Sequence, residues 1–210
     1  MRLTSTAQEI LASCYGWKAN CHDKSIGRSR PVKETEIMRK QKGFSLIELL
    51  IVVAIILIIA AIAIPNLLRA RIAANEASSV SSIRTINTAE ITYSTSYPTV
   101  GYSVTMAALG PGGAACAAPA QANACLLDNV LASAITAGTA KSGYYYGVDG
   151  VVAGTMVLTY TVGSSAAVFN QTGVRNFCSS DDGVIHFNSP AGQSTPVTTT
   201  AACQAFTVLQ

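Results

Sequence analysis

The stretch that decides the fold is Gly43-Phe44-Ser45-Leu46-Ile47-Glu48, which leads into the uninterrupted apolar run Leu49–Ile64. Coiled as an α-helix, residues 46–68 would measure about 35 Å, enough to cross a bilayer core of about 30 Å. The segment just before this stretch is basic, with Arg39, Lys40 and Lys42. We therefore expect a transmembrane span at about 46–68 with its N-terminal side in the cytoplasm, because basic flanks stay on that side.

Glu48 is the anomaly in this apolar tract. A carboxylate deep in a membrane helix costs about 2.5–3.5 kcal/mol on insertion scales, so such residues are functional candidates. If the chain were cut after Gly43, the new N-terminus would be the ammonium group of Phe44. Glu48 could neutralise that ammonium in its own chain or in a neighbouring subunit. Such a pair would also fix the axial register of packed helices, because an unpaired buried charge is strongly penalised.

The sequence Lys42-Gly43-Phe44-Ser45-Leu46-Ile47-Glu48-Leu49-Leu50 resembles the prepilin signal of type IV pilins and type II secretion pseudopilins. The resemblance is specific over residues 38–68 and looser to about Pro98. It implies cleavage after Gly43 and N-methylation of Phe44 by a prepilin peptidase and methyltransferase. It also implies that Glu48 serves assembly and that Pro65 kinks the first helix.

The same resemblance implies a fold and a function. The fold would be α+β, with one long helix whose C-terminal half packs on a small antiparallel β-meander. The function would be that of a structural subunit of a type IV pilus-type filament, and not an enzyme. The expected partners are other copies of the chain, the inner-membrane assembly platform, minor pilins and, before assembly, membrane lipid. The protein would be anchored in the bacterial inner membrane and then lie in a periplasmic or extracellular filament.

Three alternatives stay open at this point. A pseudopilin of a type II secretion system carries the same signal and builds a short periplasmic piston. A membrane-anchored periplasmic binding module would keep the bond between residues 43 and 44 and would need no carboxylate at Glu48. An ordinary secretory signal could be cut after Ala61-Ile62-Ala63, which has the small-x-small pattern of such sites.

We divide the chain into four parts, the first of which is a leader over 1–43. Met38 begins a short basic leader, 38–43, so residues 1–37 are interpreted as a misassigned start, with a long leader as the rival. The second part is one long helix over 44–97, ended by Ser96-Tyr97-Pro98.

An apolar stripe in the second half of this helix is expected to dock the rest of the domain. Its members are Ala73, Ala77, Val80, Ile83, Ile86 and Ile91. The interspersed charges Glu76, Arg84 and Glu90 are interpreted as solvated or subunit-contact groups rather than as a site.

The third part, 98–142, is a Gly-, Ala- and Pro-rich connection. We expect a helical turn within Ser103–Leu109, stopped by Gly110, and a second helix at about 125–137. The sequence Gly110-Pro111-Gly112-Gly113 lacks the Gly-Lys-Ser/Thr ending of a phosphate-binding loop, so it is interpreted as a plain loop.

The fourth part, 143–210, has the period of two that is typical of strands. Strands are predicted at about 144–148, 156–162, 174–178 and 184–187, joined in part by the turn signals Asp149-Gly150 and Asp181-Asp182-Gly183. Four sequential strands favour an antiparallel meander followed by a Ser/Thr-rich tail.

Four cysteines follow the expected leader, and they allow three disulfide connectivities. We expect Cys116–Cys125 and Cys178–Cys203, because both pairs close local loops and an exported domain favours disulfides. Zinc is the weaker alternative, since no pair has Cys-x-x-Cys spacing and His186 is the single histidine after the leader.

Further candidate sites are few. Asp181 and Asp182 could contribute to a calcium site, but two adjacent carboxylates in a hairpin supply few of the six to eight oxygens required, so a turn is favoured. Tyr144-Tyr145-Tyr146 is interpreted as strand packing. Asn170-Gln171-Thr172 matches a glycosylation sequon and indicates an accessible loop. No nucleotide fingerprint or catalytic constellation is visible, and we expect no cofactor.

Charge gives no indication of nucleic-acid binding. The net charge of +3 arises because residues 1–43 carry nine Lys and Arg against four Asp and Glu, whereas residues 44–210 carry five against seven. The basic excess thus lies in the part that we expect to be removed.

Overall fold

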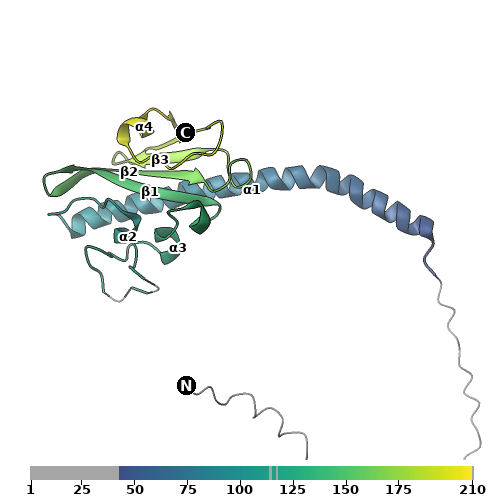
Figure 1. The fold of residues 1–210 in the computed structure, drawn as a ribbon, viewed down its shortest axis with the longest axis horizontal. Helices are drawn as coiled ribbons and strands as arrows, with labels where there is room; N and C mark the ends of the chain where they lie inside the picture. The colour runs from purple at the N-terminus through teal and green to yellow at the C-terminus, as the bar shows by residue number, and fades with distance from the viewer. Residues whose placement is uncertain (1–42, 114, 117, 210) are drawn as a thin grey trace, which may run out of the picture. The chain divides into compact units, whose positions relative to one another are not determined.

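The computed structural model describes residues 43–113, 115–116 and 118–209, and all of its helices and strands fall within one compact unit, Ser45–Gln210. Apart from Gly43, the leader expected over 1–43 lies outside the described residues. Figure 1 shows a long helix, α1, whose C-terminal half lies under a small sheet while its N-terminal half extends beyond the sheet. The α+β prediction is confirmed.

Helix α1 spans Leu46–Ser96, 51 residues, or about 77 Å at 1.5 Å per residue. Its first half is apolar on all sides and its second half is amphipathic. Tyr97 follows as the C-cap, and its backbone N–H donates to the Tyr93 carbonyl at 2.9 Å. Pro98 then prevents continuation, as the sequence predicts.

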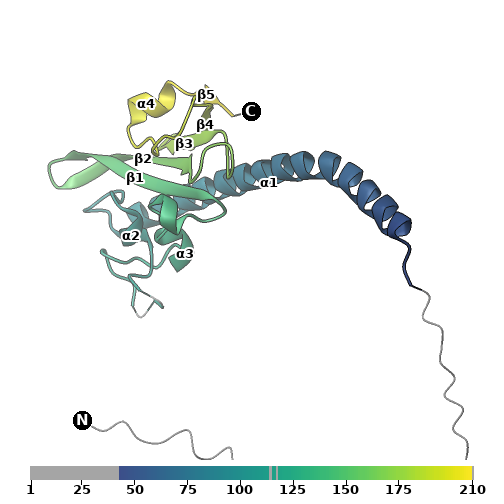
Figure 2. The same cartoon turned by 45° about the vertical axis from the view of Figure 1, so that its right-hand side comes forward.

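The sheet has five strands in the order β1-β2-β3-β4-β5, each antiparallel to the next. The strands are β1 (Tyr144–Ala153), β2 (Met156–Ala166), β3 (Asn176–Ser180), β4 (Ile185–Asn188) and β5 (Thr207–Val208). Figure 2 shows the tail with its short helix α4 (Thr200–Gln204) and β5 lying next to β3 and β4. Neither α4 nor β5 is evident in the sequence pattern, because both are too short to show a period.

The turn predicted at Asp149-Gly150 is wrong. These residues pair with Thr161 and Tyr160 in the middle of the β1–β2 ladder. The strand continues because Val151 and Val152 also favour extended backbone. The chain instead reverses at Gly154, whose φ of +68° suits a tight turn.

Strand β3 begins two residues later than the sequence predicts. The backbone N–H groups of Val174 and Arg175 donate to Glu76 Oε1 of α1 at 3.1 and 3.0 Å. Because these donors are used by the helix, the ladder with β2 starts only afterwards. The turn at Asp181-Asp182-Gly183 is found between β3 and β4 as expected.

In the connecting region, α2 (Met106–Leu109) stops at Gly110, as expected. The helix predicted over 125–137 is wrong in extent. Only α3 (Asn129–Ala132) and a 3₁₀ turn, Ala137–Thr139, form there. Helix α3 starts late because the Asp128 side chain accepts from the Leu131 N–H, as an N-cap does.

The residues just before Asp128 are held in a non-helical conformation. Cys125 has a φ of +59°, and the N–H groups of Leu126 and Leu127 both donate to the Leu109 carbonyl. The apolar pattern there therefore marks a buried loop that packs on α2 rather than a helix face.

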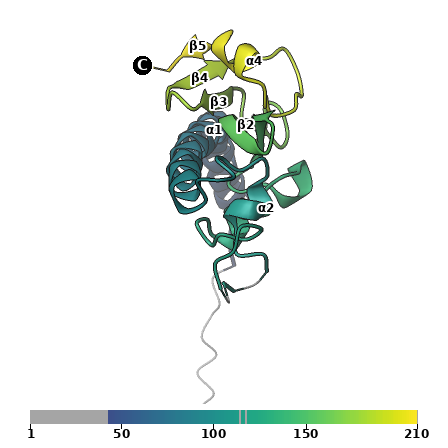
Figure 3. The same ribbon diagram turned by 90° about the vertical axis from the view of Figure 1, so that its left-hand side faces the viewer.

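The core lies between α1 and the facing side of the sheet, and Figure 3 shows the ribbon of α1 next to the strands. Its largest fully buried side chains include Ile83, Ile86, Tyr144, Tyr146, Tyr160 and Phe177. The predicted stripe is correct at Ile83 and Ile86 but wrong at Ile91, which is 56% exposed, and at Ala73 and Ala77, which are also exposed. Glu76, Ser79, Glu90 and Tyr93 are buried on that face instead, so the helix is rotated relative to the apolar pattern.

Candidate functional site

Gly43 and Phe44, the expected cleavage residues, are both solvent-exposed. Phe44 is 86% exposed, and a Cβ built on Gly43 would have no neighbour within 4 Å. A glycine that packs against nothing is not required by the fold, so its presence at this point is open to a functional explanation.

Glu48 lies in the first turn of α1, where a negative charge is favoured by the free backbone N–H groups of the helix. Its Oε2 accepts a hydrogen bond from the Ser45 N–H at 3.0 Å. The carboxylate therefore faces the amino end of the helix.

The apolar tract of α1 is uncovered along its whole length. Large side chains from Leu46 to Leu68 are exposed, and within the described residues α1 is the one helix long and apolar enough to cross a membrane. Leaving so much contiguous apolar surface in water is unfavourable, because burial is worth about 25 cal/mol per Å². The tract thus requires lipid or protein around it.

Pro65 lies inside this tract without ending the helix. Helix α1 is assigned continuously from Leu46 to Ser96, and Figure 1 shows it curved rather than broken. Proline removes one backbone hydrogen bond, which permits bending. Pro65 thus does not interrupt the helix.

Glu76 is not a solvated charge, contrary to the sequence-based interpretation. It is buried, and Arg175 Nε and Nη2 lie 2.8 and 2.7 Å from its Oε2. Its other oxygen accepts the two backbone N–H groups before β3. Arg175 also lies over the rings of Phe177 and Phe187, 5.5 Å from each centroid. One carboxylate therefore joins the helix to the sheet.

Glu90 is also wrongly interpreted as solvated, since its side chain is fully buried. Oε2 accepts from the Ser103 N–H at 2.8 Å, while Oε1 has no hydrogen-bond partner among the described residues. Burial raises the pKa of Glu90 to about 8, against an ordinary value of 4.5, although the hydrogen bond from Ser103 works the other way. Glu90 is therefore a neutral acid at neutral pH.

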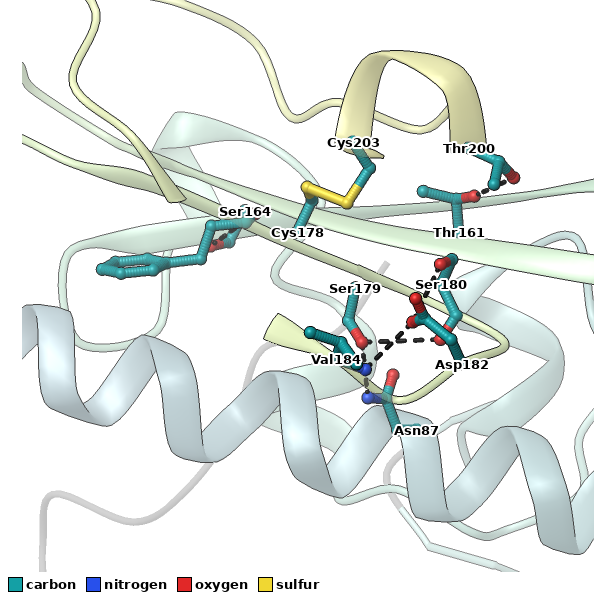
Figure 4. Close-up of a disulfide and its surroundings, with 11 residues drawn as sticks. Asn87, Thr161, Ser164, Cys178, Ser179, Ser180, Asp182, Val184, Thr200 and Cys203 are labelled. Carbon is teal, nitrogen blue, oxygen red and sulfur yellow. Dashed lines mark hydrogen bonds between the residues drawn. A yellow bond between two sulfur atoms is a disulfide. The ribbon is translucent and has the colours of Figure 1, made fainter. Parts of the chain in front are cut away.

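Two further contacts between helix and sheet are polar. Ser79 and Ser164 share a hydrogen bond of 2.8 Å, and Asn87 Nδ2 donates to Ser179 Oγ at 2.9 Å. Figure 4 shows Asn87 reaching up from α1 to Ser179 on β3. These bonds fix the rotation and register of the helix, because a slip would leave buried polar groups without partners.

Two disulfides are present, Cys116–Cys125 and Cys178–Cys203, the same two pairs as expected from the sequence. The first closes a loop of nine residues in the connecting region. The second fastens α4 to β3 across 25 residues of chain, as Figure 4 shows. Cys178 and Cys203 are fully buried.

Asp182 serves the turn between β3 and β4. Its Oδ1 accepts from Ser180 Oγ at 3.0 Å and from the Val184 N–H at 2.9 Å, and these bonds can be followed in Figure 4. Asp181 is exposed next to it. Among the residues that the structure describes, no group of three or more His, Cys, Asp or Glu could hold a metal ion.

The three consecutive tyrosines of β1 fill structural positions. Tyr144 and Tyr146 are buried in the core, and the Tyr145 hydroxyl donates to the Ser194 carbonyl at 2.9 Å. Asn170 lies exposed in the loop before β3 with a φ of +61°, which agrees with an accessible sequon position.

Comparison with known proteins concerns the N-terminal part of the chain. Residues 38–64 match a family described as the prokaryotic N-terminal methylation motif. Over this segment the chain carries the N-terminal signal to which the sequence was found to be similar. The recognition made from Gly43, Phe44 and Glu48 is confirmed at this level.

One curated relative is the "Type IV wide pilus major component PilA4" of Thermus thermophilus, 69% identical over 39 residues. That alignment takes in 19% of this chain and spans 30% of the relative's length. No solved structure matches the chain. A match of 39 residues is too short to take in both the long helix and the sheet, so the likeness does not extend to the whole fold.

Proposed function

We propose that the chain, after removal of residues up to Gly43, is a structural subunit of a type IV pilus-type filament. The observation that carries the proposal is the uncovered apolar half of α1, which begins with one carboxylate, Glu48, in its first turn. The match of residues 38–64 to the prokaryotic N-terminal methylation motif supports it. The role is one of assembly and not of catalysis.

Assembly follows from the chemistry of this segment. Cleavage frees the ammonium group of Phe44, which is then N-methylated and pairs with Glu48 of its own or a neighbouring subunit. The Glu48 carboxylate already faces the amino end of the helix, where it accepts from the Ser45 N–H. In the filament, helix–helix packing replaces lipid contacts, so the charge pair supplies register more than net attraction.

The proposal implies a sequence of locations and partners. A transmembrane span at about residues 46–68 holds the precursor in the inner membrane, with its leader in the cytoplasm. In that membrane it meets the prepilin peptidase and methyltransferase. The assembly platform and minor pilins then move it into a filament of identical copies. The four cysteines in two disulfides suit an exported domain, because such bonds persist in oxidising compartments.

Mass spectrometry of the mature N-terminus in membrane and sheared-surface fractions tests the proposal. A chain that begins with N-methyl-Phe44 in sheared fibres is the expected result. The same terminus in membranes alone would favour a pseudopilin. An intact bond between Gly43 and Phe44, or a start after Ala63, would refute the filament proposal.

Substitution of Glu48 tests the pairing step separately. Glu48→Gln keeps the shape and removes the charge, so the chain should insert and be cleaved normally but yield few filaments. Asn66→Ala, in the same apolar tract, is the matched control and should assemble. Normal filament yield from Glu48→Gln would refute the charge pair while leaving cleavage untouched.

A further inference from the structure

The side of α1 that points away from the sheet is nearly free of charge. Its exposed residues follow helical spacing, and we call this stripe the outer face of α1: Ser81, Arg84, Thr85, Thr88, Ile91, Thr92 and Thr95. Over 72–96 the other charged residues, Glu76 and Glu90, are buried. Arg84 is therefore the one exposed charge of this part of the helix, and its side chain has no ion-pair partner among the described residues.

The threonine hydroxyl groups of the outer face already donate hydrogen bonds to backbone carbonyls of α1. Thr85, Thr88 and Thr92 donate to the carbonyls of Ser81, Arg84 and Thr88 at 3.1, 3.0 and 2.8 Å. Thr95 donates to the Thr92 carbonyl at 2.8 Å. Covering this face with protein would thus leave no threonine donor without a partner, and the usual cost of burying hydroxyl groups is avoided.

The end of the β1–β2 hairpin is a second exposed surface. Its exposed apolar side chains, together with the nearby carboxylate, form what we call the hairpin end: Asp149, Val151, Val152, Met156 and Leu158. Figure 1 shows this hairpin projecting past the C-terminal end of α1. Residues 144–166 contain one charge, Asp149, and among the described residues its side chain makes a single, local hydrogen bond, with the Gly150 N–H at 2.8 Å.

The two surfaces are complementary in charge. Each is uncharged except for a single residue, an arginine on one and an aspartate on the other. Both are uncovered in the single chain, so neither satisfies the other within one copy. When two different patches of identical molecules bind each other, the contact is heterologous, and it builds an open helical filament when the rotation between copies does not close into a ring.

We propose that, in the filament, the hairpin end of one copy packs on the outer face of α1 of another copy, with Asp149 of one paired to Arg84 of the other. This inference rests on the proposed function, because only a filament brings copies of the chain together in series. It assigns the register of the folded domains to this contact, whereas Glu48 acts in the membrane-derived helical core. Charge complementarity of this kind selects one register by penalising the others.

Charge reversal tests the pair. Arg84→Asp and Asp149→Arg should each lower the mass of sheared filaments, relative to the membrane pool, by about tenfold, because each places like charges opposite each other. The double variant Arg84→Asp/Asp149→Arg should restore the yield to within about threefold of the unaltered chain, since the pair is re-formed with reversed polarity. Both positions are exposed, so folding of the domain is not at stake.

Asp181 provides the matched control, since it is also an exposed aspartate on a hairpin of the same sheet. Arg84→Asp/Asp181→Arg should remain as defective as Arg84→Asp alone. Rescue by Asp181→Arg would overturn the assignment of Asp149. Normal yield from the single reversals, or a double reversal no better than the singles, would overturn the contact altogether.

A cross-link gives an independent measurement. Thr88→Cys/Val151→Cys filaments should form covalent multimers on oxidation, while Thr88→Cys/Asn188→Cys filaments, with the second cysteine on β4, should not. Equal cross-linking in both would refute the contact. If the unaltered chain makes no filaments at all, the proposed function fails and this contact with it; if filaments form but ignore these substitutions, only the contact fails.

Discussion

Glu76 of α1 and Arg175, the residue before β3, form the one ion pair among the residues that the structure describes, with Arg175 Nη2 2.7 Å from Glu76 Oε2. The pair is separated by 99 residues of chain, and Glu76 also accepts two backbone N–H groups. The pair lies close to where α1 leaves the sheet, so it attaches the domain to the helix near the apolar half of α1.

Substitution of Glu76 should therefore detach the start of β3. Glu76→Ala should lower the free energy of unfolding by about 3 kcal/mol, because it leaves a partly buried guanidinium group and two backbone N–H donors without a partner. Glu76→Gln should cost less, since its amide oxygen can still accept the backbone bonds. Denaturant unfolding of the detergent-solubilised chain measures both. Arg84→Ala, at an exposed position of the same helix, should change stability by less than about 0.5 kcal/mol, and an equal effect at both positions would contradict the prediction.

Glu90 predicts a specific pH dependence of stability. Its pKa is about 8 in the fold and 4.5 ordinarily, so the folded chain holds a proton that the unfolded chain has released between those values. By linkage, the stability contributed by this proton is present below pH 4.5 and is lost progressively as the pH rises to about 8. At about 1.36 kcal/mol per pKa unit, the loss amounts to several kcal/mol.

Glu90→Gln should remove this dependence, because a neutral amide can accept from the Ser103 N–H and has no proton to lose. Unfolding midpoints at several pH values from about 5 to 9 provide the measurement. As the pH rises, the unfolding midpoint of the variant should increase relative to that of the unaltered chain. Parallel curves for the two chains would show that Glu90 titrates normally.

The long helix, the sequential antiparallel sheet and the turn at Asp181-Asp182-Gly183 were predictable, because each depends on a local pattern of apolar periodicity, proline or glycine. The burial of Glu76 and Glu90 was not. In the sequence each is a charged residue on an amphipathic helix, which usually faces water. Their partners, Arg175 and Ser103, are assigned only once the chain has folded, and no local rule selects them.

Two local signals were overruled by tertiary contacts. Asp149-Gly150 favours a turn, but the residues on either side of it pair with β2, so β1 continues through this position as an extended strand. Leu126 and Leu127 have helical spacing with the residues that follow, but their N–H groups are taken by the Leu109 carbonyl. In contrast, the prepilin-like segment was predictable, because its motif is a run of neighbouring residues, 38–64, and does not depend on the fold.

The two disulfides should differ in what they contribute. In the chain-entropy model, a loop of 25 residues is worth about 3.5 kcal/mol and a loop of nine about 2.6 kcal/mol. Loss of Cys178–Cys203 should cost still more, because both sulfur atoms lie in the core and the bond fastens α4 to β3. Paired Cys→Ala variants, one for each bond, should therefore rank in that order in thermal unfolding. A larger loss from the Cys116–Cys125 pair would contradict this view of the tail.

Gly173 is expected to be required by the ring of Tyr144. A Cβ at this position would overlap the Tyr144 hydroxyl and ring, and that ring is fully buried against Phe177. Gly173→Ala should thus lower the free energy of unfolding by about 1–3 kcal/mol through overpacking. Gly138→Ala is the control, since its Cβ would meet nothing closer than 3.9 Å.

A double substitution shows whether the hydroxyl is the cause. Tyr144→Phe alone should cost about 1 kcal/mol, because it removes the bond that the Tyr144 hydroxyl donates to the Arg175 carbonyl at 2.7 Å. In Gly173→Ala/Tyr144→Phe the closest overlapping atom is gone. The free energy of unfolding of the double variant should therefore fall by less than the sum of the losses in the two single variants. Strictly additive losses would mean that Gly173 is needed for its backbone, in the bridge that it forms with Phe169, and not for the room that it leaves to the ring.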